Sequence, residues 1–417
     1  MDINQAKKIH IVGDQGIGIS ALAKILAARG ARVSGSDVQT GGHRAENVPT
    51  DAELLIYSNA VPADNAERVR AGELGIPELS YPQALGEMVR GKKVIAVAGT
   101  NGKTTTTAMI GWVLEQAEFD PTVIVGSRVL AWDSNARAGK SEWVVIEADE
   151  YKRAFLNYDP DIAVITNIAL DHLDYFENLT DIKKAFLQFT QKIKPGGVLV
   201  FNMDDGNASS VAGEFQGELI GFSANEDKFD LQAPGSFNQA NAAAAVAVCR
   251  VLGISQEAII KALREFSGTW RRFEKIGKLG KTEIISDYAH HPDAIRSALQ
   301  AAAETYPGKK VLVVFQPHQH NRTKKLFSAF VEALCDSGAA DMIIPEIFDV
   351  AGREAGPDQD ISSKDLVKEL KMCGKQVSYA GDLQDCEEQI RKMADNYDAI
   401  ILMGAGDIYK VAENLTK

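Results

Sequence analysis

The sequence is poor in cysteine. Its 417 residues include only four, Cys249, Cys335, Cys373 and Cys386. None forms a CxxC pair, and none stands at a metal-ligand spacing with histidine, so the sequence indicates neither a disulfide framework nor a zinc site. We expect four reduced thiols that serve as packing residues, as is usual in a cytoplasm.

Long apolar runs and an excess of positive charge are also missing. No uninterrupted apolar run reaches the roughly 18 residues that a membrane span requires, and the N-terminus lacks the pattern of a signal peptide. With 57 acidic residues against 45 basic ones, the formal net charge is −12, which gives no general electrostatic reason to bind nucleic acid. The sequence predicts a cytoplasmic protein without membrane insertion or a nucleic-acid partner.

Apolar runs typical of buried strands alternate with helical patterns from end to end, which predicts βαβ units with parallel sheets. The expected strands are 9–12, 54–57, 94–98, 143–146, 162–166, 198–201, 283–286, 311–315, 341–345 and 399–403. The expected helices are 20–29, 104–115, 181–192, 238–252, 255–266, 292–305 and 323–337. Seams near residues 90–93 and 267–269 predict an α/β protein of three domains, 1–91, 92–268 and 269–417.

A glycine-bearing turn follows the first strand, with glycines at Gly13, Gly16 and Gly18. Glycines between a strand and a helix allow a diphosphate to approach the helix N-terminus, but Gln15 replaces the middle glycine of a GxGxxG pattern. A turn that binds no ligand is about equally expected. After the next strand, Ser36 and Asp37 stand where a ribose-binding acid would lie, although Asp37 could equally cap a helix.

A phosphate loop is the strongest local pattern. The strand at 94–98 runs into the loop and helix start formed by Gly99, Thr100, Asn101, Gly102, Lys103, Thr104 and Thr105. Backbone N–H groups of such a loop can surround phosphate oxygens, Lys103 can lie between the β- and γ-phosphates, and Thr104 can ligate Mg²⁺. Val97 replaces one glycine of the full pattern, so the loop is a variant that predicts a nucleoside triphosphate site.

Polar residues follow two further strands. Glu147 comes directly after the strand at 143–146, where a second metal ligand is expected, although acidic strand ends are also common without a metal. Asn167 and His172 follow the strand at 162–166. A lone histidine at such a position is usually a capping or hydrogen-bonded residue.

The order of motifs along nearly the whole chain resembles the Mur ligase family, the ATP-dependent amide-forming enzymes of bacterial cell-wall precursor synthesis. The segments are GTNGKTTTT (99–107), EADE (147–150), TNIALDHLDY (166–175), NQAN (238–241), RRFE (271–274), DYAHHPDAI (287–295), FQPHQHNRT (315–323) and GAGDI (404–408). VSGSD (33–37), SNAR (134–137) and QPHQHNRT are most similar to the branch that joins L-alanine to UDP-N-acetylmuramate, whereas EADEY is similar to the tripeptide-recycling branch.

The resemblance implies a fold and a reaction. The fold would be a shortened N-terminal Rossmann-like domain that binds the UDP-sugar, a central ATP-binding domain with a P-loop ATPase-like parallel or mixed sheet, and a C-terminal Rossmann-like domain that binds the amino acid. The reaction would pass through an acyl phosphate and release ADP and phosphate. ATP and Mg²⁺ are the expected cofactors, the other partners are small molecules, and the protein would be a monomer or homodimer.

The resemblance also implies roles for residues at matching positions. Lys103, Asn167, His172 and Arg272 would be catalytic, while Thr104, Glu147 and His172 would hold Mg²⁺. The phosphate loop would bind ATP together with Asn238, Asn241, Arg272 and Asp287. Substrate-binding residues would be Gly13, Gly16, Gly18, Ser36, Asp37, Asn135, Arg137, His290, His318 and Arg322, with a guanidinium able to pair with an α-carboxylate.

Four features depart from the alanine-adding pattern: Gln15, Asn101, Phe237, and a segment after Asp37 that lacks a strand-helix piece. Alternative functions are therefore the murein tripeptide recycling ligase, a folate-polyglutamate-type ligase, and a non-catalytic ATP-binding regulator. A dinucleotide-dependent oxidoreductase built on the first glycine turn is disfavoured by the phosphate loop.

Overall fold

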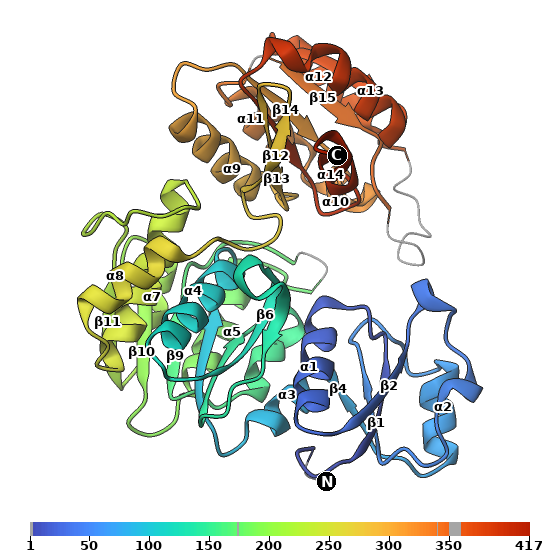
Figure 1. The fold of residues 1–417 in the computed structure, drawn as a ribbon, viewed down its shortest axis with the longest axis vertical. Coiled ribbons are helices and arrows are strands. Elements are labelled where there is room, and N and C mark those ends of the chain that lie inside the picture. The colour runs from blue at the N-terminus through green and yellow to red at the C-terminus, as the bar shows by residue number, and fades with distance from the viewer. Residues whose placement is uncertain (1–2, 173–174, 340, 350–359) are drawn as a thin grey trace. The chain divides into compact units, whose positions relative to one another are not determined.

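Three β-sheets follow one another along the chain, each covered by helices, in the computed structural model (Figure 1). The structure describes residues 3–172, 175–339, 341–349 and 360–417. The predicted α/β class is confirmed. No helix within these ranges is long and apolar enough to cross a membrane.

The first sheet has four parallel strands in the order β2-β1-β3-β4. They are β1 (Lys8–Val12), β2 (Arg32–Ser36), β3 (Leu54–Tyr57) and β4 (Glu78–Ser80). The helices are α1 (Ile17–Ala28), α2 (Ala66–Glu73) and α3 (Tyr81–Val89). Residues 37–53, which we call the connector, join β2 to β3 through two 3₁₀ turns, η1 (Val38–Thr40) and η2 (Ala45–Asn47), without an α-helix or a strand.

The second sheet has seven strands in the order β11-β10-β9-β5-β8-β6-β7, all parallel except β7. They are β5 (Lys93–Ala98), β6 (Thr122–Val129), β7 (Ser134–Arg137), β8 (Trp143–Glu147), β9 (Ile162–Ile165), β10 (Val198–Asn202) and β11 (Glu218–Phe222). The helices are α4 (Lys103–Gln116), α5 (Leu179–Thr190), α6 (Gly206–Ala212), α7 (Ser236–Val251) and α8 (Gln256–Glu265); 3₁₀ turns are η3 (Leu130–Trp132) and η4 (Tyr151–Asn157). The central strand β5 is buried on both faces because its apolar run is continuous.

The third sheet has six strands in the order β12-β13-β17-β14-β15-β16, with only β12 antiparallel. They are β12 (Glu274–Leu279), β13 (Thr282–Asp287), β14 (Val311–Phe315), β15 (Asp341–Pro345), β16 (Gln376–Ala380) and β17 (Ala399–Met403). Its helices are α9 (Pro292–Thr305), α10 (His320–Lys325), α11 (Phe327–Cys335), α12 (Ser363–Met372), α13 (Leu383–Met393) and α14 (Tyr409–Leu415); η5 is Ala394–Asn396.

The chain forms two compact units. The first contains Met1–Gln232 and Gln239–Thr269, and the second contains Ala233–Asn238 and Trp270–Lys417. The first two sheets therefore belong to one unit and the third sheet to the other.

Two predictions are wrong in detail. Cys335 and Cys373 form a disulfide, whereas Cys249 and Cys386 are free and buried. The sequence could not show this pair because the two cysteines lie 38 residues apart and meet only where α11 packs against α12. The helix predicted over 323–337 is interrupted at Leu326, where the backbone leaves helical geometry (φ −106°, ψ 15°) between α10 and α11.

Candidate functional site

The phosphate loop lies between the end of β5 and the start of α4, as the sequence predicts. Gly99 and Gly102 have φ values of +138° and +85°, a region that side chains rarely adopt. A Cβ at Gly99 would also collide with the Thr166 hydroxyl. Both glycines are therefore required by the backbone of the loop.

The end of β9 holds this loop in shape. The Thr100 N–H donates to the Asn167 carbonyl at 3.0 Å, and the Asn101 N–H donates to Asn167 Oδ1 at 3.0 Å. Asn167 Nδ2 donates in return to the Asn101 carbonyl at 2.8 Å, and Thr166 Oγ1 donates to the same carbonyl at 2.6 Å. The structure thus brings Asn167 to the loop, where its amide supports the loop backbone.

Lys103 is the first residue of α4, and Glu150 holds its ammonium group. Nζ lies 2.9 and 3.1 Å from the two carboxylate oxygens and donates to the Gly99 carbonyl at 2.6 Å. Only 13% of the Lys103 side chain and 2% of the Glu150 side chain are exposed. Burial alone would lower the pKa of Lys103, but the charges of Glu150, Asp149 and Glu147 outweigh it and raise that pKa. Lys103 is therefore a fixed cation.

Thr104 and Glu147, two of the three predicted metal ligands, lie together. Thr104 Oγ1 donates to Glu147 Oε1 at 3.0 Å, and the Gly126 N–H donates to Glu147 Oε2 at 2.7 Å. A hydroxyl and a carboxylate in contact are oxygen donors of the kind that Mg²⁺ prefers.

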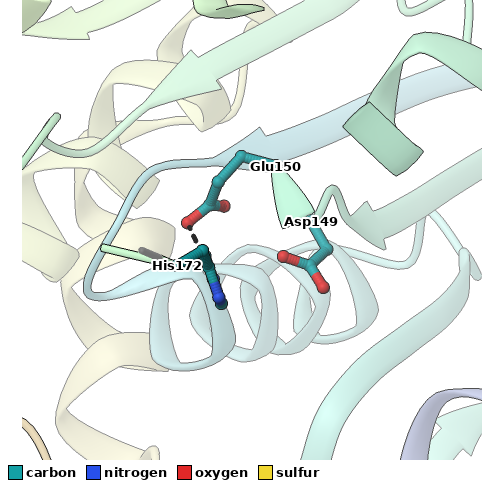
Figure 2. A group of neighbouring side chains, drawn as sticks. All are labelled: Asp149, Glu150 and His172. Carbon is teal, nitrogen blue, oxygen red and sulfur yellow. Dashed lines mark ion pairs between the residues drawn. The ribbon is translucent and has the colours of Figure 1, made fainter. Parts of the chain in front are cut away.

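A second group of potential ligands contains Asp149, Glu150 and His172, shown in Figure 2. One ligand atom from each lies within 4.8 Å of the others, and His172 Nε2 lies 3.8 Å from Glu150 Oε1. Sequence reasoning assigned His172 to a metal site but missed Asp149 and Glu150. The acidic run after β8 was the available signal. Leu173 and Asp174 of the same motif lie outside the described residues.

The two asparagines of α7 fall into different units. Asn241 accepts a hydrogen bond from Thr106 Oγ1 at 3.2 Å, and a Cβ at Gly102 would collide with its Oδ1, so this residue lies against the phosphate loop. Asn238 belongs to the second unit and donates to the Pro234 carbonyl at 2.8 Å.

In the second unit, Asp287 is buried at the end of β13. Its carboxylate accepts from the N–H groups of Phe273 and Ala289, each at 2.7 Å. Burial raises the pKa of Asp287, with Arg272 acting in the opposite direction. The Arg272 guanidinium lies 5.1 Å from the centre of the Tyr288 ring. Asp287 therefore braces the backbone around Arg272.

The three residues predicted to line the amino-acid pocket lie together in the same unit. Arg322 Nη1 lies 3.2 Å from His318 Nδ1, and the rings of His318 and His290 are 5.8 Å apart. The Phe348 ring stacks on His318 at 5.6 Å. This arrangement presents a guanidinium beside two imidazoles, which suits a small anion such as an α-carboxylate.

In the first sheet, the predicted nucleotide-sugar residues lie at the carboxyl ends of β1 and β2. The Gly13 N–H donates to the Ser36 carbonyl at 2.7 Å, and the side chain of Asp37 caps η1 by accepting from the Gln39 N–H at 2.9 Å. A Cβ at Gly18 would lie 2.8 Å from the Tyr81 hydroxyl, and one at Gly16 would lie 3.2 Å from Ile19. Asp37 thus acts as a cap in this structure.

Asn135 and Arg137 have different surroundings although both lie on β7. Asn135 is buried and donates to the Ile17 carbonyl at 2.6 Å, next to the first glycine turn. Arg137 pairs with Glu115 and Asp120, each at 2.8 Å. The structure brings Asn135, but not the Arg137 head group, to α1.

Three family models match successive parts of the chain. They are the "Mur ligase family, catalytic domain" over residues 8–93, the "Mur ligase middle domain" over 97–230 and the "Mur ligase, glutamate ligase domain" over 271–406. A curated UDP-N-acetylmuramate–L-alanine ligase of Lachnospira eligens is 38% identical over 462 aligned positions, covering 100% of this chain and 99% of the relative. The chain belongs to the Mur ligase family.

Other relatives agree with this assignment. The UDP-N-acetylmuramate–L-alanine ligase of Caldanaerobacter subterraneus is 36% identical, covering 99% of this Mur ligase and 98% of the relative. The crystal structure of the UDP-N-acetylmuramate-alanine ligase of Thermotoga maritima has a TM-score of 0.81 and 29% identity, with 98% of both chains covered. A murein peptide ligase of Psychrobacter arcticus shares the fold, with a TM-score of 0.70 and 22% identity over 98% of both chains.

Proposed function

We propose that this Mur ligase joins L-alanine to UDP-N-acetylmuramate with consumption of ATP, in peptidoglycan precursor synthesis. The observation that carries the proposal is the identity of 33–38% over at least 98% of the chain to curated ligases named for this reaction. The assembled phosphate loop and the cluster of Arg322 with two histidines support it from the structure.

We propose that the residues of the first unit bind the triphosphate and Mg²⁺. The loop N–H groups and Lys103 would hold the phosphates, while the two ligand groups described above offer Thr104, Glu147, Asp149, Glu150 and His172 to metal ions. Hard oxygen donors predominate in this set, which fits Mg²⁺. A bound Mg²⁺ would neutralise phosphate charge.

The chemistry explains why cations are gathered here. An oxygen of the substrate carboxylate forms a bond to the γ-phosphorus while the bond to the leaving ADP oxygen breaks, which gives an acyl phosphate. The amine of L-alanine then attacks the acyl carbon, loses a proton, and the C–O bond to phosphate breaks. Approach of a carboxylate to a phosphate brings like charges together, so Lys103 and Arg272 would stabilise the charge that develops.

We also propose that each of three successive parts of the chain binds a different ligand. Residues 1–91 would bind the UDP-sugar, 92–268 would bind ATP, and 269–417 would bind the amino acid, where Arg322 can pair with the α-carboxylate. We place the reaction in the cytoplasm, where ATP is available, and propose a monomer or homodimer.

Phosphate release from ATP and Mg²⁺ with UDP-N-acetylmuramate tests the function, with L-alanine, glycine, L-serine and the tripeptide supplied separately. We expect release coupled to an L-alanine adduct in the mass spectrum of the product. A tripeptide adduct would instead assign the protein to the recycling branch. Measurable ATP binding without release in any of the four assays would refute the proposed reaction.

A further inference from the structure

Glu67 is a completely buried carboxylate in the first sheet's domain, and none of the roles described above uses it. It lies on α2, and its side chain is 0% exposed. Four groups donate hydrogen bonds to it: His10 Nε2 at 2.9 Å, Ser36 Oγ at 2.7 Å, Asn47 Nδ2 at 2.7 Å and the Arg44 N–H at 3.0 Å. A carboxylate is rarely buried so fully unless its position matters to the fold or to a site.

The donors come from β1, β2 and the connector. His10 lies within β1, Ser36 ends β2, and the other two belong to the connector. Asn47 Nδ2 also donates to the Gly42 carbonyl at 3.1 Å, which closes the segment 42–47 in the middle of the connector. Glu67 therefore links the connector to the middle of β1 and the end of β2.

His43 is the connector residue that extends this network toward the solvent. The single hydroxyl proton of Ser36 is directed to Glu67, so His43 Nδ1, 3.1 Å from Ser36 Oγ, is the donor in that contact. The same Nδ1 lies 3.6 Å from Glu67 Oε1, and 15% of the His43 side chain is exposed. Glu67 thus fixes both the rotamer of Ser36 and the ring of His43.

Glu67 keeps its charge in this setting. Burial would raise the pKa of its carboxyl, but the hydrogen bonds from His10, Ser36 and Asn47 outweigh burial and lower the pKa to about 2. The Glu67 carboxylate is therefore ionised near neutral pH and accepts hydrogen bonds from β1, β2 and the connector.

We propose that Glu67 is a positioning residue for the nucleotide-sugar site, acting through Ser36 and His43 at the start of the connector. The inference rests on the proposed function, because it requires that UDP-N-acetylmuramate binds at the ends of β1 and β2. The connector has no α-helix or strand, and two of its residues, Arg44 and Asn47, hydrogen-bond to this side chain. Without Glu67, Ser36 and His43 lose the acceptor that orients them.

The test compares Glu67→Gln with Glu73→Gln in the full-length enzyme. Glu73 lies on the same helix, is 59% exposed and pairs with Arg70, so it is a matched control for the loss of one charge. The glutamine keeps the size of Glu67, but it has no charge and its NH₂ group faces groups that donate hydrogen bonds to the carboxylate. For Glu67→Gln we expect the KM for UDP-N-acetylmuramate to rise about 10- to 100-fold. The KM for ATP and for L-alanine and the kcat should stay within about twofold of wild type.

A purely structural role would give a different pattern. If Glu67→Gln lowers the melting temperature but leaves the KM for UDP-N-acetylmuramate equal to that of Glu73→Gln, the proposal is wrong. If Glu67→Gln does not fold, Asn47→Ala removes the hydrogen bonds of Asn47 to Glu67 and to the Gly42 carbonyl and leaves His10 and Ser36 in place. We expect a rise of about 3- to 10-fold in the same KM for Asn47→Ala, and an unchanged value would overturn the proposal.

Failure of the proposed function would be recognised separately. Calorimetric titration of the wild-type enzyme with UDP-N-acetylmuramate measures binding without turnover. A wild type that neither binds nor consumes it would refute the proposed function together with this role of Glu67. A wild type that binds it, beside a Glu67→Gln variant of equal affinity, would refute only the positioning role.

Discussion

Lys103→Ala should destabilise the first unit as well as abolish ligation. The ammonium group of Lys103 faces a Glu150 carboxylate that is 2% exposed, at 2.9 and 3.1 Å. Removal of the lysine leaves that carboxylate buried, with the His172 imidazole as a neighbour, Nε2 lying 3.8 Å from Glu150 Oε1. An activity loss in this variant alone therefore could not separate chemistry from folding.

The size of the effect follows from the burial of the pair. Removal of one partner of a buried ion pair costs about 3–5 kcal/mol, and replacement of both partners is often close to neutral. Because His172 remains near Glu150, we expect the lower end, about 3 kcal/mol. For a unit of this size, that corresponds to a fall in Tm of roughly 6–12 °C.

The double variant Lys103→Ala/Glu150→Gln provides the control. Its Tm should return most of the way to wild type, since no buried charge is left unpaired, while phosphate release stays absent. The wild type, both single variants and the double variant form a double-mutant cycle. Each is measured by thermal unfolding with circular dichroism and by the phosphate assay. Near-normal turnover by Lys103→Ala, or a Tm of the double variant no higher than that of Lys103→Ala, would refute the reasoning.

Three further predictions concern other parts of the molecule. Arg322→Ala should raise the KM for L-alanine about 10- to 100-fold through loss of carboxylate pairing, with little change in the KM for ATP; steady-state kinetics would show it. Cys335→Ser opens a disulfide between residues 38 apart, so urea unfolding should show the second unit destabilised by up to about 4 kcal/mol, with dithiothreitol giving the same loss in wild type and none in the variant. The stability that Glu67 contributes is complete above its ordinary pKa of 4.5 and is lost as the pH falls toward about 2; Glu67→Gln should lack this window in acid unfolding.

The buried strands were predictable because their apolar runs are unbroken. The expected strands at 54–57, 341–345 and 399–403 coincide with β3, β15 and β17. Three strands that were not predicted, β4, β7 and β12, are short or polar and lie at sheet edges, and their exposed positions interrupt any apolar pattern. The eight-residue strand β6 was also missed, although it is mostly buried and lies inside its sheet. Sequence periodicity reports burial, and an edge strand has little of it.

The contacts of the candidate site also differ in whether the sequence predicts them. The contact between Thr104 and Glu147 was predictable because a phosphate-loop threonine and a strand-end carboxylate meet at the carboxyl edge of a parallel sheet. The partnership of Lys103 with Glu150 was not, because the sequence cannot say which of two neighbouring acids turns inward. Glu67 belongs to no recognised motif. The sequence feature that pointed to a buried polar partner was His10, which interrupts an apolar strand.

The mutual hydrogen bonds between Asn101 and Asn167 have a consequence for nucleotide affinity. Fixing the backbone of one residue costs roughly 1–2 kcal/mol of conformational entropy, and the four loop residues Gly99, Thr100, Asn101 and Gly102 are ordered by contacts within the protein. Folding has already restricted this loop, so its contacts with a triphosphate act on a preorganised surface. Asn167→Ala removes the side chain that hydrogen-bonds to the backbone of Asn101 and so loosens the loop. This variant should therefore bind ATP more weakly.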